Sequence, residues 1–324
     1  MRNASTGGKR GEGQERSCVT VKTARGDVRM PAYLPVTTFG DSFPLDRLIQ
    51  PFLPRFADML MVSYAYAKSI TKRPEMPLFI DSGGFACLLD GYRVICREDG
   101  TGCIVGPSPT TDENKDNNQE GQAADMRGTT ADSGGPGEVI SPEGVLELQN
   151  RLADFASTLD FPIPPSLDAV RERKLRLDLT LANARYAIDA KVDASRLFGS
   201  VQGFDLDTYT SSAESLVSMG FSDLAIGGMV PRARDKAFVL QVCRRVADVL
   251  PEGGLLHVFG IGDPSFVAAL FAAGATSIDS SSYVQSAVSG KQWDGEAAMQ
   301  DPSPLERAHA ALRNLKFATE YLGV

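Results

Sequence analysis

The stretch LLHVFGIGDPSFVAALFAAGATSIDSSSY, residues 255–283, holds two short apolar runs on either side of a helix-like segment. The runs LLHVFGIG (255–262) and TSIDSSS (276–282) are β-compatible and are closed by turn residues. Residues 264–273 between them have the pattern of a helix. A strand, a helix and a second strand in this order predict two parallel strands joined by a crossover.

The same alternation occurs along the rest of the chain. Further apolar runs stand at MLMVSY (59–64), PLFIDSGG (77–84), LFGSVQG (197–203) and DLAIGGM (223–229). Helical patterns lie between them, and one opens at Ser141-Pro142-Glu143, with serine as the N-cap and proline at the first helical position. About six to eight such units predict an α/β fold, a (β/α)8 TIM barrel. A doubly wound open sheet is the alternative.

The composition is that of an ordinary globular protein. Of the 324 residues, 43% are apolar and 23% are charged, which excludes collagenous, coiled-coil and wholly disordered chains. No apolar stretch reaches the roughly 18 to 20 residues of a membrane-spanning helix, and the opening MRNASTGGKRGEGQER has no apolar secretion segment. We therefore expect a cytoplasmic protein without membrane attachment.

Two segments differ from the rest in composition. Residues 1–16 are polar and Gly-rich, and we expect a flexible tail there. Residues 107–137 are almost devoid of large apolar side chains, and we expect a disordered, low-complexity insertion in a loop. The remaining sequence, 17–324, is predicted to form a single TIM-barrel domain.

The residues that usually bind metals are few and scattered. The five cysteines show no C-x-x-C spacing, and the chain has two histidines, so we expect no metal site. The net charge of −8 argues against broad, nonspecific binding to nucleic acid. The basic residues at 171–176, with Arg232, Arg234, Lys236, Arg244 and Arg245, form either a solvated helix face or a set of phosphate contacts.

Two carboxylates follow predicted strands and precede small residues: Asp81 in LFIDSGGF and Asp279 in ATSIDSSSY. In a barrel the strand ends carry the catalytic residues. Two acids facing each other there can perform glycosidic chemistry, one attacking the anomeric carbon while the other transfers a proton. The alternative is that each aspartate caps the turn or helix that follows it.

Several stretches, taken together, resemble the tRNA-guanine transglycosylase family in the family's own order. PAYLPVTTFG, PLFIDSGGF and SPEGVLELQNRLADF followed by LDFPIPP are similar to its first three elements. LFGSVQG and LAIGGM are similar to its Val-Gln-Gly and Ile-Gly-Gly strand ends. The stretch at 257–283 resembles the one that carries the nucleophile and is most similar to archaeosine-type members. The resemblance covers roughly residues 31–283.

The resemblance implies exchange of a base in an intact polynucleotide. Asp279 stands at the position of the family's nucleophile and would attack C1′ of a guanosine, leaving a covalent ribosyl-enzyme. A free 7-deazaguanine, or guanine itself, would then attack C1′, so that configuration is retained. Asp81 would protonate the departing guanine and accept a proton from the incoming base.

The resemblance also implies how the base is held. Asp160 would accept hydrogen bonds from its pyrimidine edge, Gln202 would offer a donor and an acceptor, and two aromatic rings would stack on its faces. The predicted substrate-binding residues are Asp160, Gln202, Gly227, Gly228, Phe85, Phe259, Ser82 and Gly83. The structural alternatives are core positions for the phenylalanines, a strand-end hydrogen bond for Gln202 and ordinary turns for the glycines.

The sequence departs from the family where members usually carry zinc, held by three cysteines and a histidine near the C-terminus. No cysteine follows Asp279, and Arg313 in AALRNLKF stands where the histidine is expected. We therefore expect no zinc and no other cofactor. Because of this departure, the sequence does not decide which nucleic acid is the substrate. tRNA is favoured, and DNA is the alternative.

A noncatalytic partner subunit of a transglycosylase is the third hypothesis. The presence of both Asp81 and Asp279 argues against it, because a scaffold has no chemical need for two acids at strand ends. Association into a homodimer or a heterodimer is a further expectation.

Overall fold

The computed structural model describes residues 19–39, 43–107, 137–190 and 196–321. The predicted tail at 1–16 lies outside the described residues, as does nearly all of the predicted insertion at 107–137. None of the helices in these ranges combines the length and the apolar composition that a membrane span requires.

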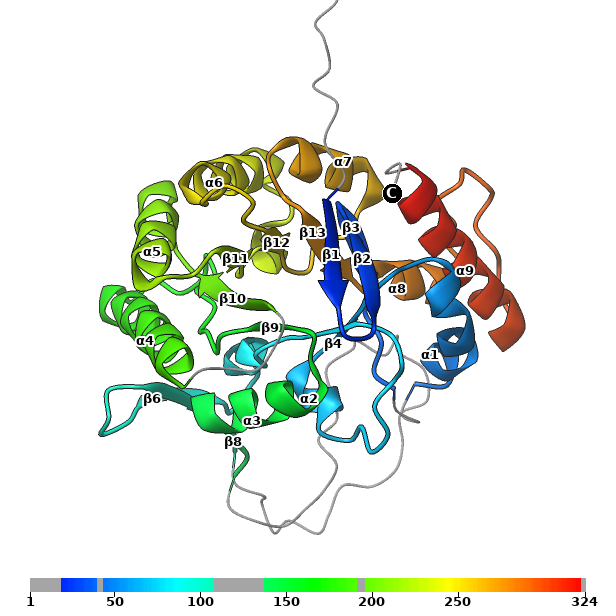
Figure 1. Cartoon of the computed structure of the whole chain (residues 1–324). Helices are drawn as coiled ribbons and strands as arrows, with labels where there is room; N and C mark the ends of the chain where they lie inside the picture. Colours follow the sequence, from blue (N-terminus) through cyan, green and yellow to red (C-terminus); the bar gives the residue numbers. More distant parts are fainter. Residues whose placement is uncertain (1–18, 40–42, 108–136, 191–195, 322–324) are drawn as a thin grey trace, which may run out of the picture.

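Eight parallel strands form the central sheet, and the order of the strands in the sheet is their order in the chain (Figure 1). The strands are β3 (Ala32–Pro35), β4 (Leu60–Val62), β5 (Leu78–Ile80), β9 (Phe155–Ser157), β10 (Arg196–Val201), β11 (Asp223–Ile226), β12 (Leu256–Val258) and β13 (Ser277–Ser280). A parallel bridge between Val36 and Met61 brings the first and second strands together and closes the ring. The predicted (β/α)8 barrel is confirmed, and the doubly wound sheet is excluded because its strand order reverses at a switch point.

Helices surround this barrel and cover the outer face of the strands (Figure 1). They are α1 (Pro44–Ile49), α2 (Tyr64–Ala67), α3 (Pro142–Leu152), α4 (Val170–Asp189), α5 (Leu206–Met219), α6 (Lys236–Val249), α7 (Pro264–Ala272), α8 (Ser282–Val288) and α9 (Pro304–Tyr321), with 3₁₀ turns η1 (Gln50–Arg55), η2 (Gly84–Leu88) and η3 (Val230–Arg232). The predicted start of α3 is confirmed, because the Ser141 hydroxyl accepts the Gly144 N–H at 3.3 Å and Pro142 is the first helical residue.

A small antiparallel sheet lies between β5 and α3 in the chain. It consists of β6 (Arg93–Cys96), β7 (Gly102–Val105) and β8 (Val139–Ile140). β7 pairs with both β6 and β8, so the compositionally biased segment joins two strands that are neighbours in this sheet.

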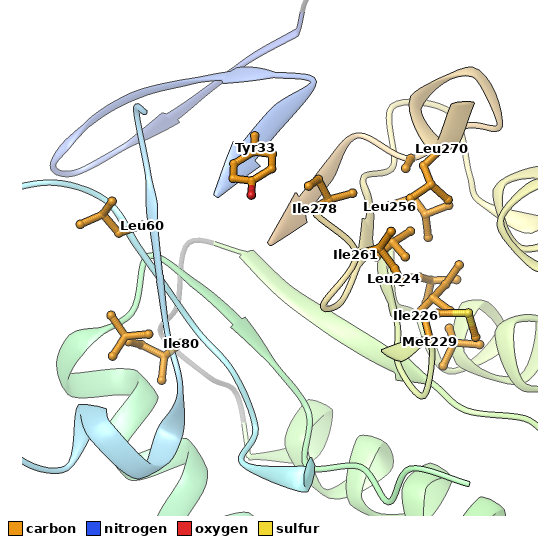
Figure 2. Packing of buried hydrophobic residues seen from close by; sticks show 14 of the residues in the cluster. Tyr33, Leu60, Ile80, Leu224, Ile226, Met229, Leu256, Ile261, Leu270 and Ile278 are labelled. Atoms are coloured by element: carbon orange, nitrogen blue, oxygen red, sulfur yellow. The ribbon is translucent and has the colours of Figure 1, made fainter. Parts of the chain in front are cut away.

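Side chains alternate between the two faces of each barrel strand and build two cores. Outward residues such as Leu60, Ile80, Leu224, Leu256 and Ile278 pack under the helices (Figure 2). Inward residues fill the barrel, and they are Leu34, Met61, Phe79, Phe155, Phe198 and Ala225. The barrel is thus filled by side chains rather than open along its axis.

An N-terminal hairpin, which the sequence patterns do not predict, closes one end of the barrel. Strands β1 (Val19–Thr23) and β2 (Gly26–Met30) place Val21, Val28 and Met30 in the same core as the inward barrel residues. Arg25 on its turn pairs with Asp154, which immediately precedes β9. The hairpin therefore covers the amino ends of the strands, opposite the end at which catalytic residues are expected.

We expect Val28→Ala to lower the free energy of unfolding by about 2 kcal/mol, because its fully buried side chain fills the base of the barrel. Val19→Ala on the same hairpin is the matched control, since Val19 is 46% exposed. Urea unfolding of both variants measures the difference. An equal loss in the free energy of unfolding for the two variants would contradict the proposed packing of the hairpin against the barrel interior.

Candidate active site

Alternation along the strands brings the two predicted acids to the carboxyl end of the barrel. Phe79 in β5 points into the barrel, so Asp81, two residues later, lies on the same inward face. Asp279 is the third residue of β13, and its inward neighbour two residues earlier is Ser277. The acids approach each other closely enough for the charge on Asp279 to raise the pKa of Asp81.

Asp81 lies at a turn that positions its carboxylate. One oxygen, Oδ1, accepts the backbone N–H of Tyr64 at 2.6 Å and that of Gly83 at 3.0 Å. Gly83 has φ +74°, a left-handed conformation that favours glycine. The bond to Gly83 is the turn-capping contact that the structural alternative expected, so Asp81 caps a turn while also facing the mouth of the barrel.

The pKa of Asp81 is raised to about 7, mainly by burial and to a smaller extent by the charges on Asp279 and Asp160. The two backbone N–H bonds act in the opposite direction. A carboxyl group with such a pKa exchanges protons near neutral pH, as a general acid and base must.

Asp279 is held from the neighbouring strand. Its Oδ1 accepts the backbone N–H of Gly260 at 2.9 Å and lies 3.1 Å from Nε2 of His257 in β12. Asp279 is 8% exposed, and the N-cap of the following helix α8 is Ser281. Asp279 therefore does not cap the helix, contrary to the structural alternative.

Asp160 forms a second polar cluster at the same end of the barrel. Its carboxylate accepts the Ser82 hydroxyl at 2.6 Å and the Gln202 amide at 2.5 Å. Burial raises the pKa of Asp160, whereas these two hydrogen bonds lower it. The Gln202 side chain is fully buried, and its carbonyl oxygen has no partner among the described residues.

Glycines pack against this cluster where no side chain would fit. A Cβ added at Gly227 would lie 2.1 Å from the Gln202 amide nitrogen, and one at Gly84 would lie 2.3 Å from the Asp160 carbonyl oxygen. Gly228 has φ +72°. Gly227 and Gly84 therefore pack directly against Gln202 and Asp160, and Gly84 was not among the predicted site residues.

The two predicted stacking rings differ in exposure. Phe85 in η2 is 54% exposed, so it is not a core residue. Phe259 directly follows β12, is partly buried and packs edge-on against His257, with ring centroids 4.5 Å apart. Stacking of a base on Phe85 and Phe259 stays a prediction.

Two residues of this region were missed or misread in the sequence. Arg232 was considered as a phosphate contact or a solvated residue, yet it is 7% exposed. Its guanidinium instead donates to the carbonyls of Ile163 at 2.8 Å and Gly228 at 3.0 Å, which ties the loop after Asp160 to the end of β11. His257 is not among the predicted site residues, although period-two alternation with Phe259 places both side chains on the same face of the strand.

Side-chain hydrogen bonds hold the segment between α8 and α9. Asn314 in α9 is fully buried; its Oδ1 accepts the Trp293 N–H at 2.9 Å. Its Nδ2 donates to the carbonyls of Tyr283 and Lys291, both at 3.1 Å. One asparagine thus connects three points of the chain at this place.

The residues of this segment do not fit the zinc site that the resemblance implies. Arg313 stands where the histidine is expected, and it forms ion pairs with Asp294 and Glu296. No cysteine occurs after Cys243. The three cysteine ligands are therefore absent. The fourth ligand, a histidine, is replaced by an arginine, whose cationic guanidinium cannot ligate a metal ion.

Comparisons with known proteins match most of the chain to one family. The model of one protein family, described as queuine tRNA-ribosyltransferase, matches residues 15–321. The chain belongs to this family. The match extends beyond both ends of the resemblance found in the sequence.

The names of individual relatives refer to two different polymers, tRNA and DNA. The chain is 34% identical over 154 residues to a tRNA-guanine(15) transglycosylase of Methanocaldococcus jannaschii, covering 44% of this chain and 23% of that protein. It is 28% identical over 151 residues to a DNA-guanine transglycosylase of Salmonella montevideo, covering 46% of this chain and 34% of that protein. A queuine tRNA-ribosyltransferase of Solidesulfovibrio magneticus is 26% identical over 289 residues, covering 83% of this chain and 69% of that protein. The aligned parts thus span well under half of the first two relatives.

The raised pKa of Asp81 predicts a pH-dependent effect on stability. The folded protein holds this proton more tightly than the unfolded chain, whose carboxyl group has its ordinary pKa of 3.8, so stability falls as pH rises from about 4 to about 7. We expect Asp81→Asn to unfold at a higher temperature than the wild type at pH 8, and the difference to shrink as the pH approaches about 4.

Thermal melts across this pH range provide the measurement. Asp207→Asn is the control, because the Asp207 side chain is 91% exposed on α5, and we expect it to change the midpoint little. A midpoint for Asp81→Asn at or below that of the wild type at pH 8 would contradict the raised pKa.

Proposed function

We propose that this protein exchanges a guanine in tRNA for a free 7-deazaguanine through a covalent ribosyl-enzyme on Asp279. The observation that carries this proposal is the pair of inward acids at the barrel mouth, one of them with a pKa raised to about 7. Family membership over residues 15–321 supports the same reaction class.

In the first half of the reaction, the Asp279 carboxylate attacks C1′ of the target nucleotide. The bond from C1′ to the guanine nitrogen breaks, and the electron pair stays on the base. Asp81 donates the proton that neutralises the leaving guanine. Its pKa near 7 supports this role, because a large share of the group is protonated at neutral pH.

In the second half, a nitrogen of the incoming base attacks C1′ from the side that guanine left. The ester bond to Asp279 breaks, the carboxylate is regenerated, and Asp81 takes the proton of the incoming base. Two inversions give net retention, as in retaining glycosidases, with a nucleobase in place of water.

Base recognition is assigned to the cluster around Asp160. An ionised Asp160 only accepts hydrogen bonds, which suits the N–H groups on the pyrimidine edge of guanine. The buried, unpartnered Oε1 of Gln202 supports a polar ligand beside it. The backbone at Gly227 and Gly228 lets the base approach closely, Ser82 and Gly83 set the turn beside it, and Phe85 and Phe259 supply the stacking faces.

DNA is the second candidate polymer. The 28% identity to a DNA-guanine transglycosylase over 151 residues favours it, and it requires the same chemistry on the same residues. A noncatalytic partner subunit is disfavoured, because placing two buried aspartates and one partly buried aspartate close together lowers stability, and a scaffold has no need of them. Association into a homodimer or heterodimer, and a cytoplasmic location, stay predictions.

An exchange assay with labelled guanine tests the reaction and the polymer together. Purified protein is incubated with tRNA or with duplex DNA, and the label retained in each polymer is counted. We expect label in tRNA and a loss of at least about 1,000-fold in Asp279→Ala, since removal of a covalent nucleophile is this costly in comparable enzymes.

The control variant is Asp207→Ala, an aspartate on the surface of α5. Label in DNA alone would assign the protein to DNA modification. Undiminished exchange by a folded Asp279→Ala protein would overturn the mechanism, and no label in either polymer with the wild type would favour a partner subunit.

We further propose that the protein works without zinc, supported by the Asn314 hydrogen bonds and the Arg313 ion pairs in the segment where the family's zinc ligands are expected. Elemental analysis of the purified protein is expected to find no stoichiometric zinc, and treatment with a chelator is expected to leave the melting temperature unchanged. One tightly held zinc ion per chain would contradict this prediction.

A further inference from the structure

His257 connects two inward side chains of the neighbouring strand. His257 pairs with Ser277 in the register of β12 and β13, and Asp279 follows two residues later on the same face. The imidazole Nδ1 lies 2.9 Å from the Ser277 hydroxyl, and Nε2 lies 3.1 Å from Oδ1 of Asp279. The ring is fully buried.

One neutral tautomer of His257 satisfies both contacts. An ionised carboxylate only accepts hydrogen bonds, so Nε2 carries the hydrogen and donates to Asp279. Nδ1 is then an acceptor and takes the hydroxyl hydrogen of Ser277. Phe79 and Phe259 pack on the imidazole with centroids 4.7 and 4.5 Å away, which fixes the ring between them.

Both hydrogen-bond donors to Asp279 bind the same carboxylate oxygen, Oδ1. The Gly260 N–H and the His257 Nε2–H point at Oδ1, and among the described residues no hydrogen bond reaches Oδ2. The carboxylate is therefore held by one oxygen, while the other is left to form the bond to C1′.

We propose that His257 is a positioning residue that stabilises the free Asp279 carboxylate relative to its ribosyl ester. This inference rests on the proposed function. A hydrogen bond to a charged carboxylate is stronger than one to a neutral ester carbonyl, so the Nε2–H favours the state in which the ester has been broken.

The balance of the second half-reaction shows where His257 acts. The base nitrogen forms its bond to C1′ while the bond from C1′ to Oδ2 of Asp279 breaks, and the electron pair of that bond returns to the carboxylate. The proton of the base nitrogen goes to Asp81. Negative charge thus grows on Asp279 as the base attacks, and the donors on Oδ1 stabilise it.

Two polar substitutions separate this role from packing. In His257→Gln the amide nitrogen can reach the place of Nε2 and keep the donor, whereas in His257→Asn the shorter amide is withdrawn from Asp279. His309→Leu is the control, since His309 is exposed on α9 and is the other histidine of the chain. Each protein is incubated with tRNA and with DNA in the absence of free base, and the covalent protein–polynucleotide adduct is measured on a denaturing gel.

We expect the ratio of adduct to free enzyme to rise about tenfold in His257→Asn, as the loss of one hydrogen bond to a charged group implies. We expect His257→Gln and His309→Leu to stay within about twofold of the wild type, because the donor is retained. Exchange of labelled guanine should fall in His257→Asn and be largely restored in His257→Gln.

The failures of the two proposals are distinguishable. If the wild type forms no adduct and exchanges no base with either polymer, the proposed function is wrong. If the wild type does both and His257→Asn gives the same adduct ratio as His257→Gln, the proposed function stands and the role of His257 is overturned.

Discussion

The closure of eight parallel strands into one ring is the constraint on which the rest of the structure depends. Because the strands are parallel, all their carboxyl ends meet at one rim, and alternation sends every second side chain toward the axis. Asp81 and Asp279 are remote in the sequence but come together through this geometry alone. The phenylalanines below them fill the interior of the barrel.

Three aspartates, two buried and one partly buried, share this rim, and each accepts hydrogen bonds from its own pair of donors. Asp81 is bound by two backbone N–H groups, Asp160 by Ser82 and Gln202, and Asp279 by Gly260 and His257. The donors allow like charges to lie near one another at a tolerable cost. They also give the acids different tasks, since the group with its pKa near 7 is suited to carrying a proton.

The features predicted from local sequence were those governed by short-range rules. Strand and helix alternation predicted the barrel, and Ser141 with Pro142 predicted the start of α3. The candidate site residues were predicted from their positions at strand ends and from the family resemblance. The N-terminal hairpin escaped prediction because half or more of each strand is exposed, and Arg232 was misread because its partners are backbone carbonyls from distant loops. Such carbonyls leave no mark in the amino-acid pattern.

The hairpin at the amino ends of the strands is also a suitable place to attach the protein to a surface. Lys22 on β1 is exposed and belongs to the end of the barrel opposite the acids. Coupling the protein to a bead or a sensor chip through this hairpin would orient the molecules alike, with their reactive rims facing the liquid. A long polymer flowing over such a surface would meet the rim without obstruction from the support.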